Sequence, residues 1–545
     1  MEIFQGFLLL LVGAVGLTAI ARRVNVPYPS LLALGGVALA LLVPAAPQIE
    51  VDPELMLVLF VAPVLLDAAY DTSVRDLRQN WIPITCLVIA AVGVTTLAVA
   101  WTAHALVPGM SWAAAIALGA IVAPPDAAAA SAILKQLRLP HRLLVILQDE
   151  SLLNDASALM IYRIAVLAVA SGGLNFATVV PLSLLAIVGS VIAGYLLARI
   201  SMRFFLSLTD VPSSIVMQFA STFGVWILAE FLHLSAIVTL VVYGITVARD
   251  APRLIPARNR LPSYAVWDLA VFVLNVLAFV LIGLQLGPIL GPLSPEERVE
   301  YFKVATIVLG ICIAARFVWV YSYALVARLK VRWAGPGRWP GTARPTVRGS
   351  FVVSWCGMRG IVTLAAAYAL PSDFPHRDLI VFTSFCVVVG TLVLQGLTLR
   401  PLILLLNLHD DDPVNREVRM ACERVVHAGL QLLDGDESEE AQVIRRELES
   451  QLTELDDESK DVNELDQYSS LRARIVAAQR QALLEMRSKY EIGDDAFHQI
   501  EAQLDVAEVN AFGGGVSVSG TRRFKSTCGY ARCSDSPNPR PYPPP

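Results

Sequence analysis

Long apolar runs alternate with short polar connections along most of the chain. A helix needs roughly 20 mostly apolar residues to cross about 30 Å of hydrocarbon. Thirteen segments between Ile3 and about Asn407 meet this requirement. The expected spans are 3-21, 26-44, 53-70, 81-106, 112-134, 143-170, 177-198, 213-231, 234-248, 266-290, 303-327, 349-370 and 378-406. The pattern predicts an all-α integral membrane protein with about 13 transmembrane helices.

The composition supports this prediction. Of the 545 residues, 55% are hydrophobic and only 16% are charged, which is more apolar surface than a soluble core requires. The apolar start at 2-21 lacks the basic region and cleavage site of a signal peptide. We therefore expect it to be retained as the first helix.

Positive charges mark one side of the predicted membrane. The loops after odd-numbered spans are rich in arginine and lysine, whereas those after even-numbered spans hold only Arg298, Lys303 and Arg377. Basic loops face the cytoplasm. The expected location is the cell membrane, multi-pass, with the N-terminus outside and the C-terminus cytoplasmic. The net charge of -5 indicates no nucleic-acid partner.

The composition changes after the last span. We expect a transmembrane domain at 1-407, an acidic helical cytoplasmic region at 408-512 and a disordered tail at 513-545, which is rich in glycine and proline. The cytoplasmic region is either passive or regulatory. The seven cysteines lack metal-site spacing, so we interpret them as free thiols and expect no cofactor.

The sixth span carries polar residues that lipid would not tolerate. It reads LLVILQDESLLNDASALMIYRIAV, and ionisable groups within spans are candidates for function. Helical spacing places Ser151 beside Asp155, a face that offers oxygens to a hard cation, and Glu150 beside Asn154 on the adjoining face. The alternative is that the span is a structural helix whose charges form salt bridges. For Glu150 taken alone, this alternative weighs as much as a role in the ion site.

Two other spans contain helix breakers at mid-membrane. Pro124 and Pro125 should break the fifth span, after which Asp126 either caps the half-helix that restarts there or meets an ion. In the twelfth span, Gly357 and Gly360 flank Arg359. A buried guanidinium demands an acidic partner, and the sequence favours Glu150, which gives a structural ion pair.

The remaining charges within spans are less informative. Asp67 ends the third span, either as a second carboxylate of the site or as an interfacial charge. We expect Asp268 and Asn275 to pair with Arg316 between the tenth and eleventh spans.

Several motifs together resemble a known family. They are QDESLLND (148-155), APPDAAAASAIL (123-134), LAFVLIGLQL (277-286), ILAEFLHLSAIVTLVVYGI (227-245) and GMRGIVTLAAAYALP (357-371). The chain is similar to bacterial monovalent cation/proton antiporters of the sodium/proton exchanger superfamily. The resemblance implies inverted repeats, two broken helices that cross beside the ion site, and a homodimer.

The resemblance also assigns roles to residues. It implies that Asp155 binds Na⁺ or H⁺ with Ser151 as a further ligand, that Asn154 marks an electroneutral branch, and that Asp126 lies at the helix crossing. Glu150 and Arg359 match the family's stabilising pair. Many members have threonine where Pro125 stands and glutamate where Asp67 stands, which leaves the choice among Na⁺, Li⁺ and K⁺ open.

We expect a secondary antiporter that exchanges Na⁺ for H⁺ within membrane lipid, and not an enzyme. A desolvated carboxylate holds a proton or a small cation at comparable cost near neutral pH, and both cannot bind together. The principal alternative is a K⁺/H⁺ antiporter. An organic-anion transporter would favour positive helix ends, an intramembrane aspartic protease needs a Gly-Asp motif that the chain lacks, and a channel needs a filter loop.

Overall fold

The structure is a computed structural model. It describes residues 2–42, 52–126, 139–171, 176–208, 210–291, 293–334, 346–408, 413–435 and 438–456, with scattered residues between 475 and 504. Within these residues the secondary structure is entirely helical. The chain divides into two units, Met1–Asp411 and Asp412–Pro545.

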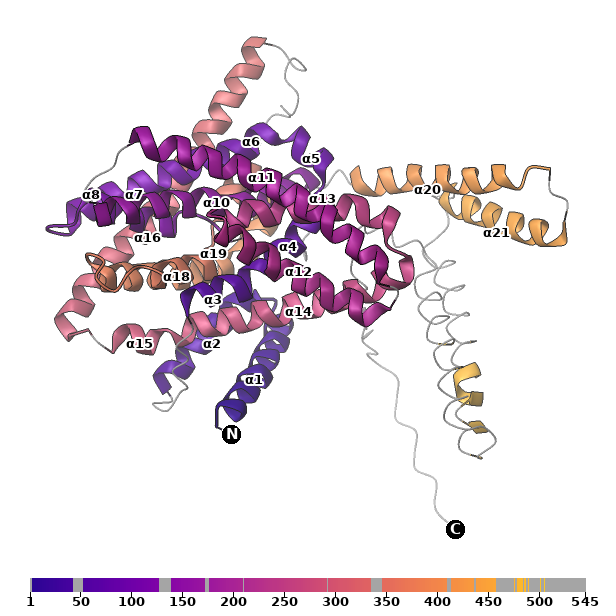
Figure 1. The fold of residues 1–545 in the computed structure, drawn as a ribbon, viewed down its shortest axis with the longest axis horizontal. Coiled ribbons are helices and arrows are strands. Elements are labelled where there is room, and N and C mark those ends of the chain that lie inside the picture. The colour runs from indigo at the N-terminus through magenta and orange to yellow at the C-terminus, as the bar shows by residue number, and fades with distance from the viewer. Residues whose placement is uncertain are drawn as a thin grey trace. The chain divides into compact units, whose positions relative to one another are not determined.

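Apolar helices make up the first unit (Figure 1). In chain order they are α1 (Glu2–Val24), α2 (Tyr28–Leu42), α3 (Pro53–Met56), η1 (Leu57–Val61), α4 (Ala62–Asp71), α5 (Val74–Gln79), α6 (Trp81–Thr85), η2 (Cys86–Ala91), α7 (Val92–Leu106), α8 (Trp112–Val122), α10 (His141–Ser171), α11 (Phe176–Ser207), α12 (Val211–Phe231), α13 (Ala236–Leu254), α14 (Ala257–Leu284), α15 (Leu286–Leu290), α16 (Pro295–Ala334), α17 (Val347–Trp355), α18 (Ile361–Tyr368) and α19 (Arg377–Leu406).

Seven helical stretches within the described ranges are long and apolar enough to cross a bilayer by themselves. They are 81–106, 141–171, 181–207, 211–231, 258–290, 295–329 and 377–406. Each segment predicted from the sequence overlaps at least one helix. The exact number of crossings remains a prediction, because several of these helices are short.

The third and fourth predicted spans each contain a π-helical stretch. η1 joins α3 to α4, and η2 joins α6 to α7. A π-helix widens the turn and recurs at functional sites. At η2 the Ser157 hydroxyl of α10 donates a 2.7 Å hydrogen bond to the Val88 carbonyl. The sequence analysis predicted neither π-helix.

The contact between α2 and α14 is close because glycines meet there. A Cβ atom on Gly36 would lie 2.4 Å from the Val280 carbonyl oxygen, and one on Gly283 would lie 2.2 Å from the Ala33 carbonyl oxygen. Both distances are too short for a side chain. Small residues that let helix backbones approach are typical of membrane-helix packing.

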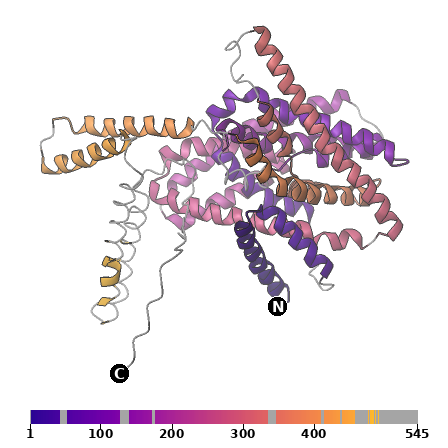
Figure 2. The ribbon, with the colours of Figure 1, turned by 180° about the vertical axis from the view of Figure 1, so that it is seen from behind.

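The helices around α10 position the candidate site. α10 contacts α8, η2, α13 and α17, while α16 contacts α7, α17 and α19. Figure 2 shows α16 as one continuous helix along the side of this unit. The site helices therefore come from segments far apart in the sequence.

The second unit contains a helical hairpin, α20 (Pro413–Leu432) and α21 (Glu439–Asp456). Val426 and Ala441 are buried there, and the Leu448 side chain packs close to Gly429. The predicted helical region at 408-512 is described only in part, and the predicted disordered tail at 513-545 lies outside the described residues.

Candidate functional site

Two helices stop in the middle of the first unit. α8 ends at Val122, just before Pro124 and Pro125, because proline lacks the N–H that would continue the helix and its ring blocks the preceding turn. α17 ends at Trp355 and α18 begins at Ile361. The break expected in the twelfth span is therefore present. The half-helix expected after Asp126 falls at 127–138, outside the described residues.

The two breaks are bonded to each other. The Asp126 backbone N–H donates to the Met358 carbonyl at 2.6 Å. The Arg359 Nε donates to the Val122 carbonyl at 2.9 Å, and its Nη2 to the Ala123 carbonyl at 3.5 Å. Arg359 also donates to the carbonyl of Gly357. A fully buried guanidinium thus satisfies carbonyls that the break in α8 leaves without helical partners.

The Asp126 carboxylate lies against the start of α18. A Cβ atom on Gly360 would overlap with Asp126 Oδ2. Gly360 precedes the first helical residue, Ile361, so the carboxylate lies at the positive end of α18. The sequence analysis had assigned Asp126 to its own half-helix or to an ion, and the structure adds this contact with the opposite break.

α10 presents Ser151 beside these breaks, with Asp155 on the same helix. The Ser151 hydroxyl donates to the Pro125 carbonyl at 3.3 Å. Asp155 is half-buried one turn further along, and the Asp126 carboxylate acts on it electrostatically. Among the described residues, no hydrogen bond involves the Asp155 carboxylate. Ser151, Pro125 and Asp155 together offer hydroxyl, carbonyl and carboxylate oxygens, the ligands that a hard cation prefers.

Glu150 has a different partner from the one expected. Arg316 of α16 forms two hydrogen bonds with the Glu150 carboxylate, of 2.5 Å and 2.9 Å, and its Nε donates to the Val353 carbonyl at 3.1 Å. The expected pair of Glu150 with Arg359 is therefore wrong, because the Arg359 guanidinium is occupied by backbone carbonyls. The expected pairing of Arg316 with Asp268 and Asn275 is also wrong, since Arg316 is bonded to Glu150 and Val353.

Asn154 belongs to this ion pair. It is fully buried, and its Nδ2 donates to Glu150 Oε1 at 3.2 Å. Glu150 therefore accepts from Asn154 on its own helix and from Arg316 on another. This network holds α10, α16 and α17 together beside the site.

The other candidates lie on α4 and α14. Asp67 is half-buried in α4, which contacts α10 and α13, and Asp268 is exposed on α14. The described cysteines, Cys86, Cys312, Cys356, Cys386 and Cys422, are free thiols as predicted. Cys528 and Cys533 lie outside the described residues.

Sequence reasoning missed one residue that supports the break. Thr391 of α19 accepts a hydrogen bond of 3.0 Å from the Arg359 backbone N–H through its hydroxyl. It is fully buried, and a single threonine in an apolar span gives no distinguishing signal, since it can equally bond its own helix.

Comparison with models of protein families shows to which family the chain belongs. The family model described as sodium/hydrogen exchanger, transmembrane, matches residues 7–405. The chain belongs to the sodium/hydrogen exchanger family. The matched residues include both breaks, Asp155 and the Glu150–Arg316 pair, so the site lies wholly within the family region. The protein is accordingly a multi-pass membrane protein, and the members of its family are ion transporters.

Individual relatives agree with this assignment. An uncharacterized Na⁺/H⁺ exchanger of Mycobacterium tuberculosis is 32% identical, over 90% of this chain and 93% of its own length. The sodium, potassium, lithium and rubidium/H⁺ antiporter of Bacillus subtilis is 28% identical, over 96% of this chain and 81% of its own. Among solved structures, the sodium proton antiporter MjNhaP1 from Methanocaldococcus jannaschii superposes with a TM-score of 0.57 at 17% identity, covering 75% of this chain and 100% of that one.

Within this family member, the site geometry separates two kinds of residue. Asp155 and Ser151 lie one turn apart on α10, and Ser151 is bonded to the Pro125 carbonyl. Glu150, Arg316, Asn154 and Arg359 are bonded to one another or to the backbone, so they shape the site. The structural likeness shows the shared fold alone, and the roles of these side chains rest on their contacts.

Proposed function

We propose that this protein exchanges Na⁺ for H⁺, with Asp155 binding each in turn. The observation that carries the proposal is the bond of Ser151 to one of two helix breaks that are bonded to each other, with Asp155 one turn further along α10 and without a hydrogen-bonding partner among the described residues. Asp126 contributes negative charge from the crossing, which attracts a cation. Neither ion needs a cofactor.

Exchange follows from competition at one carboxylate. A proton on Asp155 removes the charge that attracts Na⁺, and bound Na⁺ occupies the oxygen that would take the proton. If the site changes its exposure only when Asp155 carries one ligand, each Na⁺ moves against a proton. Ser151 and the Pro125 carbonyl replace part of the water around Na⁺. Asn154 is engaged with Glu150, and we propose that it serves the ion pair and contributes no oxygen to the ion.

The wider arrangement is part of the same proposal. We infer thirteen crossings with inverted repeats, an N-terminus outside, a cytoplasmic C-terminus and a homodimer in the plasma membrane. The alternation of basic loops supports the orientation, and the broken helices support the repeats. With one carboxylate carrying either ion, exchange should be electroneutral. Asp67, half-buried on a helix that contacts α10, is proposed as part of the access route.

A K⁺/H⁺ exchanger is the second candidate. The relative in Bacillus subtilis is named for sodium, potassium, lithium and rubidium, so the ion set within the family is broad. Pro125 provides only a backbone carbonyl where many members place threonine. The two candidates share every residue and differ only in which cation competes with the proton.

Proton flux in proteoliposomes tests the function. A pH-sensitive dye inside the vesicles reports proton movement when Na⁺, Li⁺ or K⁺ is added to the wild type, to Asp155→Asn and to Ser171→Ala, an exposed position at the end of the same helix, as a control. A sodium response that Asp155→Asn loses and Ser171→Ala retains supports the proposal. A response to K⁺ alone favours the second candidate. Exchange that persists in Asp155→Asn overturns the mechanism.

A further inference from the structure

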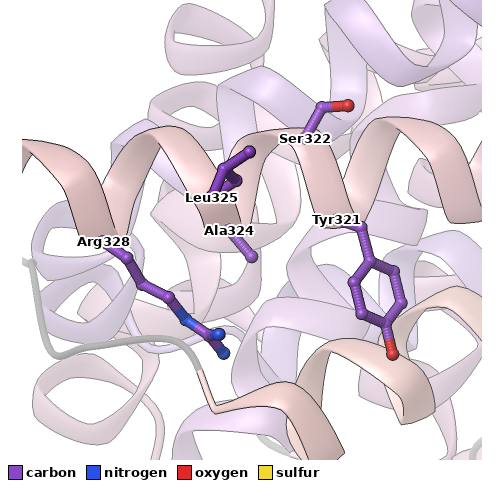
Figure 3. Close-up of a pocket in the computed structure, with 5 residues that line it drawn as sticks. All are labelled: Tyr321, Ser322, Ala324, Leu325 and Arg328. Carbon is purple, nitrogen blue, oxygen red and sulfur yellow. The ribbon is translucent and has the colours of Figure 1, made fainter.

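A hollow in the protein surface lies on α16, about two helical turns after Arg316. It has a volume of about 320 Å³ and is lined by Tyr321, Ser322, Ala324, Leu325 and Arg328. Figure 3 shows that the Tyr321 ring and the Arg328 side chain extend from the same side of the helix, with Ser322 on the opposite side. The volume falls within the range of about 300–1,000 Å³ typical of small-molecule sites.

Residue size explains the hollow. Tyr321 and Arg328 are seven residues apart, so they stand about 10 Å apart along the helix axis. Ala324 lies between them and is buried, while Leu325 is 59% exposed. Two long side chains therefore enclose a space above a small one, and an apolar side chain borders it.

The location of the hollow limits the chemical classes of ligand that it could bind. The stretch of α16 that is apolar enough to cross the membrane ends at Leu329, directly after Arg328. The sequence that follows adds Lys330, Arg332, Arg338 and Arg344. Basic residues at the end of a membrane helix attract anionic lipid headgroups. A soluble anion has no apolar part to pack against the border formed by Leu325 and Ala324.

We propose that this hollow binds the headgroup of an anionic phospholipid from the surrounding bilayer. Arg328 carries five N–H donors, so its guanidinium can hold a phosphate in addition to its contacts within the protein. The upper acyl chains and the glycerol lie against Leu325, Ala324 and the ring of Tyr321. Nothing in the exchange chemistry requires this site.

Occupation of the site should strengthen the packing of α16 against α17. The Tyr321 hydroxyl donates to the Val347 carbonyl of α17 at 3.5 Å, and Phe317 packs edge-on against Phe351 and Trp355. The same two helices are joined by Arg316 and the Val353 carbonyl. A lipid beside Tyr321 excludes water from this contact, so the bound protein should unfold at a higher temperature.

Lipid titration of the detergent-purified full chain tests the proposal. Phosphatidylglycerol and phosphatidylcholine with the same acyl chains are added separately, and binding is measured by native mass spectrometry together with the thermal midpoint. We expect the wild type to retain phosphatidylglycerol with a raised midpoint. Arg328→Gln should weaken retention about tenfold, since a charge-assisted contact is lost, whereas Arg203→Gln on α11, an exposed arginine, should retain it.

A second variant keeps the charge and removes the space. Leu325→Trp obstructs the hollow from an exposed position while Arg328 remains, so it should lose the lipid while keeping its midpoint in phosphatidylcholine. Equal retention by Arg328→Gln and the wild type, or equal binding of both lipids, overturns the proposal. A midpoint shift with glycerol phosphate equal to that with phosphatidylglycerol would assign the hollow to a soluble phosphate and also overturn it.

Discussion

The Arg316 guanidinium of α16 donates one hydrogen bond to each carboxylate oxygen of Glu150 on α10, with N···O distances of 2.5 Å and 2.9 Å. Both side chains are almost completely buried. The pair lies one residue from Ser151 and is shared with Asn154 through a further hydrogen bond. The part of α10 that presents Asp155 is therefore held by a buried ion pair.

Breaking this pair should destabilise the protein strongly. Removing one partner of a buried ion pair costs about 3–5 kcal/mol, because the other charge stays buried without compensation. We expect Arg316→Gln and Glu150→Gln each to lower the free energy of unfolding by that order in detergent titrations. The double variant should lose less than the sum of the two single losses.

The same measurement distinguishes the two arginines. A double-mutant cycle of Glu150→Gln with Arg359→Gln should give a smaller coupling energy than the cycle with Arg316→Gln, since Arg359 bonds backbone carbonyls. If the larger coupling were found with Arg359, the assignment of Arg316 as partner would be wrong.

Gly360→Ala should impair exchange by displacing Asp126. The added Cβ would overlap with the Asp126 carboxylate, so the carboxylate must leave the start of α18. We expect a loss of at least about tenfold in proton flux, because a shift of about 1 Å at a binding site costs on that order or more. Gly310→Ala on α16 is the control, since a Cβ there meets nothing within 4 Å.

Asp126→Gly combined with Gly360→Ala separates folding from transport. The double variant removes the whole Asp126 side chain that the new Cβ would meet, so it should regain the thermal midpoint of Asp126→Gly alone, without regaining exchange. Wild-type flux in Gly360→Ala would show that the position of the Asp126 carboxylate does not matter.

The KM for sodium should depend on pH in one direction. Protons occupy the carboxylate that Na⁺ needs, so lowering the pH raises the sodium KM, by up to about tenfold per pH unit when one proton competes with one cation. At high pH the proton-loaded half of the cycle becomes limiting and the maximal rate falls. Initial rates of dye response across sodium concentrations at several pH values measure both effects. A sodium KM independent of pH would exclude competition at a shared site.

Gly283→Ala should disrupt the contact between α2 and α14. Its Cβ would lie 2.2 Å from the Ala33 carbonyl oxygen, and both backbones would have to move apart. Overpacking of this kind typically costs about 1–3 kcal/mol, which thermal unfolding in detergent can detect. Gly287→Ala, four residues later, meets nothing within 4 Å and should leave the midpoint unchanged.

Some of these features could be predicted from the sequence. Apolar length and helix breakers depend on local chemistry, so the break at Cys356–Gly360 and the end of α8 before Pro124 were expected. Ser151 and Asp155 follow from helical spacing within one element. Such features need no knowledge of which helices are neighbours.

The partner of Glu150 could not be predicted in this way. Two arginines, Arg316 and Arg359, lie within different spans, and charge alone makes either one suitable. The choice depends on which helix faces Glu150 and on whether the guanidinium already has carbonyl partners, and both are properties of the packed structure. The close approach at Gly36 and Gly283 likewise depends on two helices that are far apart in the chain.

The bond between Arg359 and the Val122 carbonyl spans 237 positions of the chain. The ribosome therefore delivers α8, with its unpaired carbonyls, long before the segment that satisfies them. An unpaired backbone group costs several kcal/mol in hydrocarbon, so a nascent chain that has inserted only its first half must shelter this end with water or with the insertion machinery. The contact between the two helix breaks would then be among the last to form during biogenesis, and truncated or stalled chains would leave the end of α8 exposed.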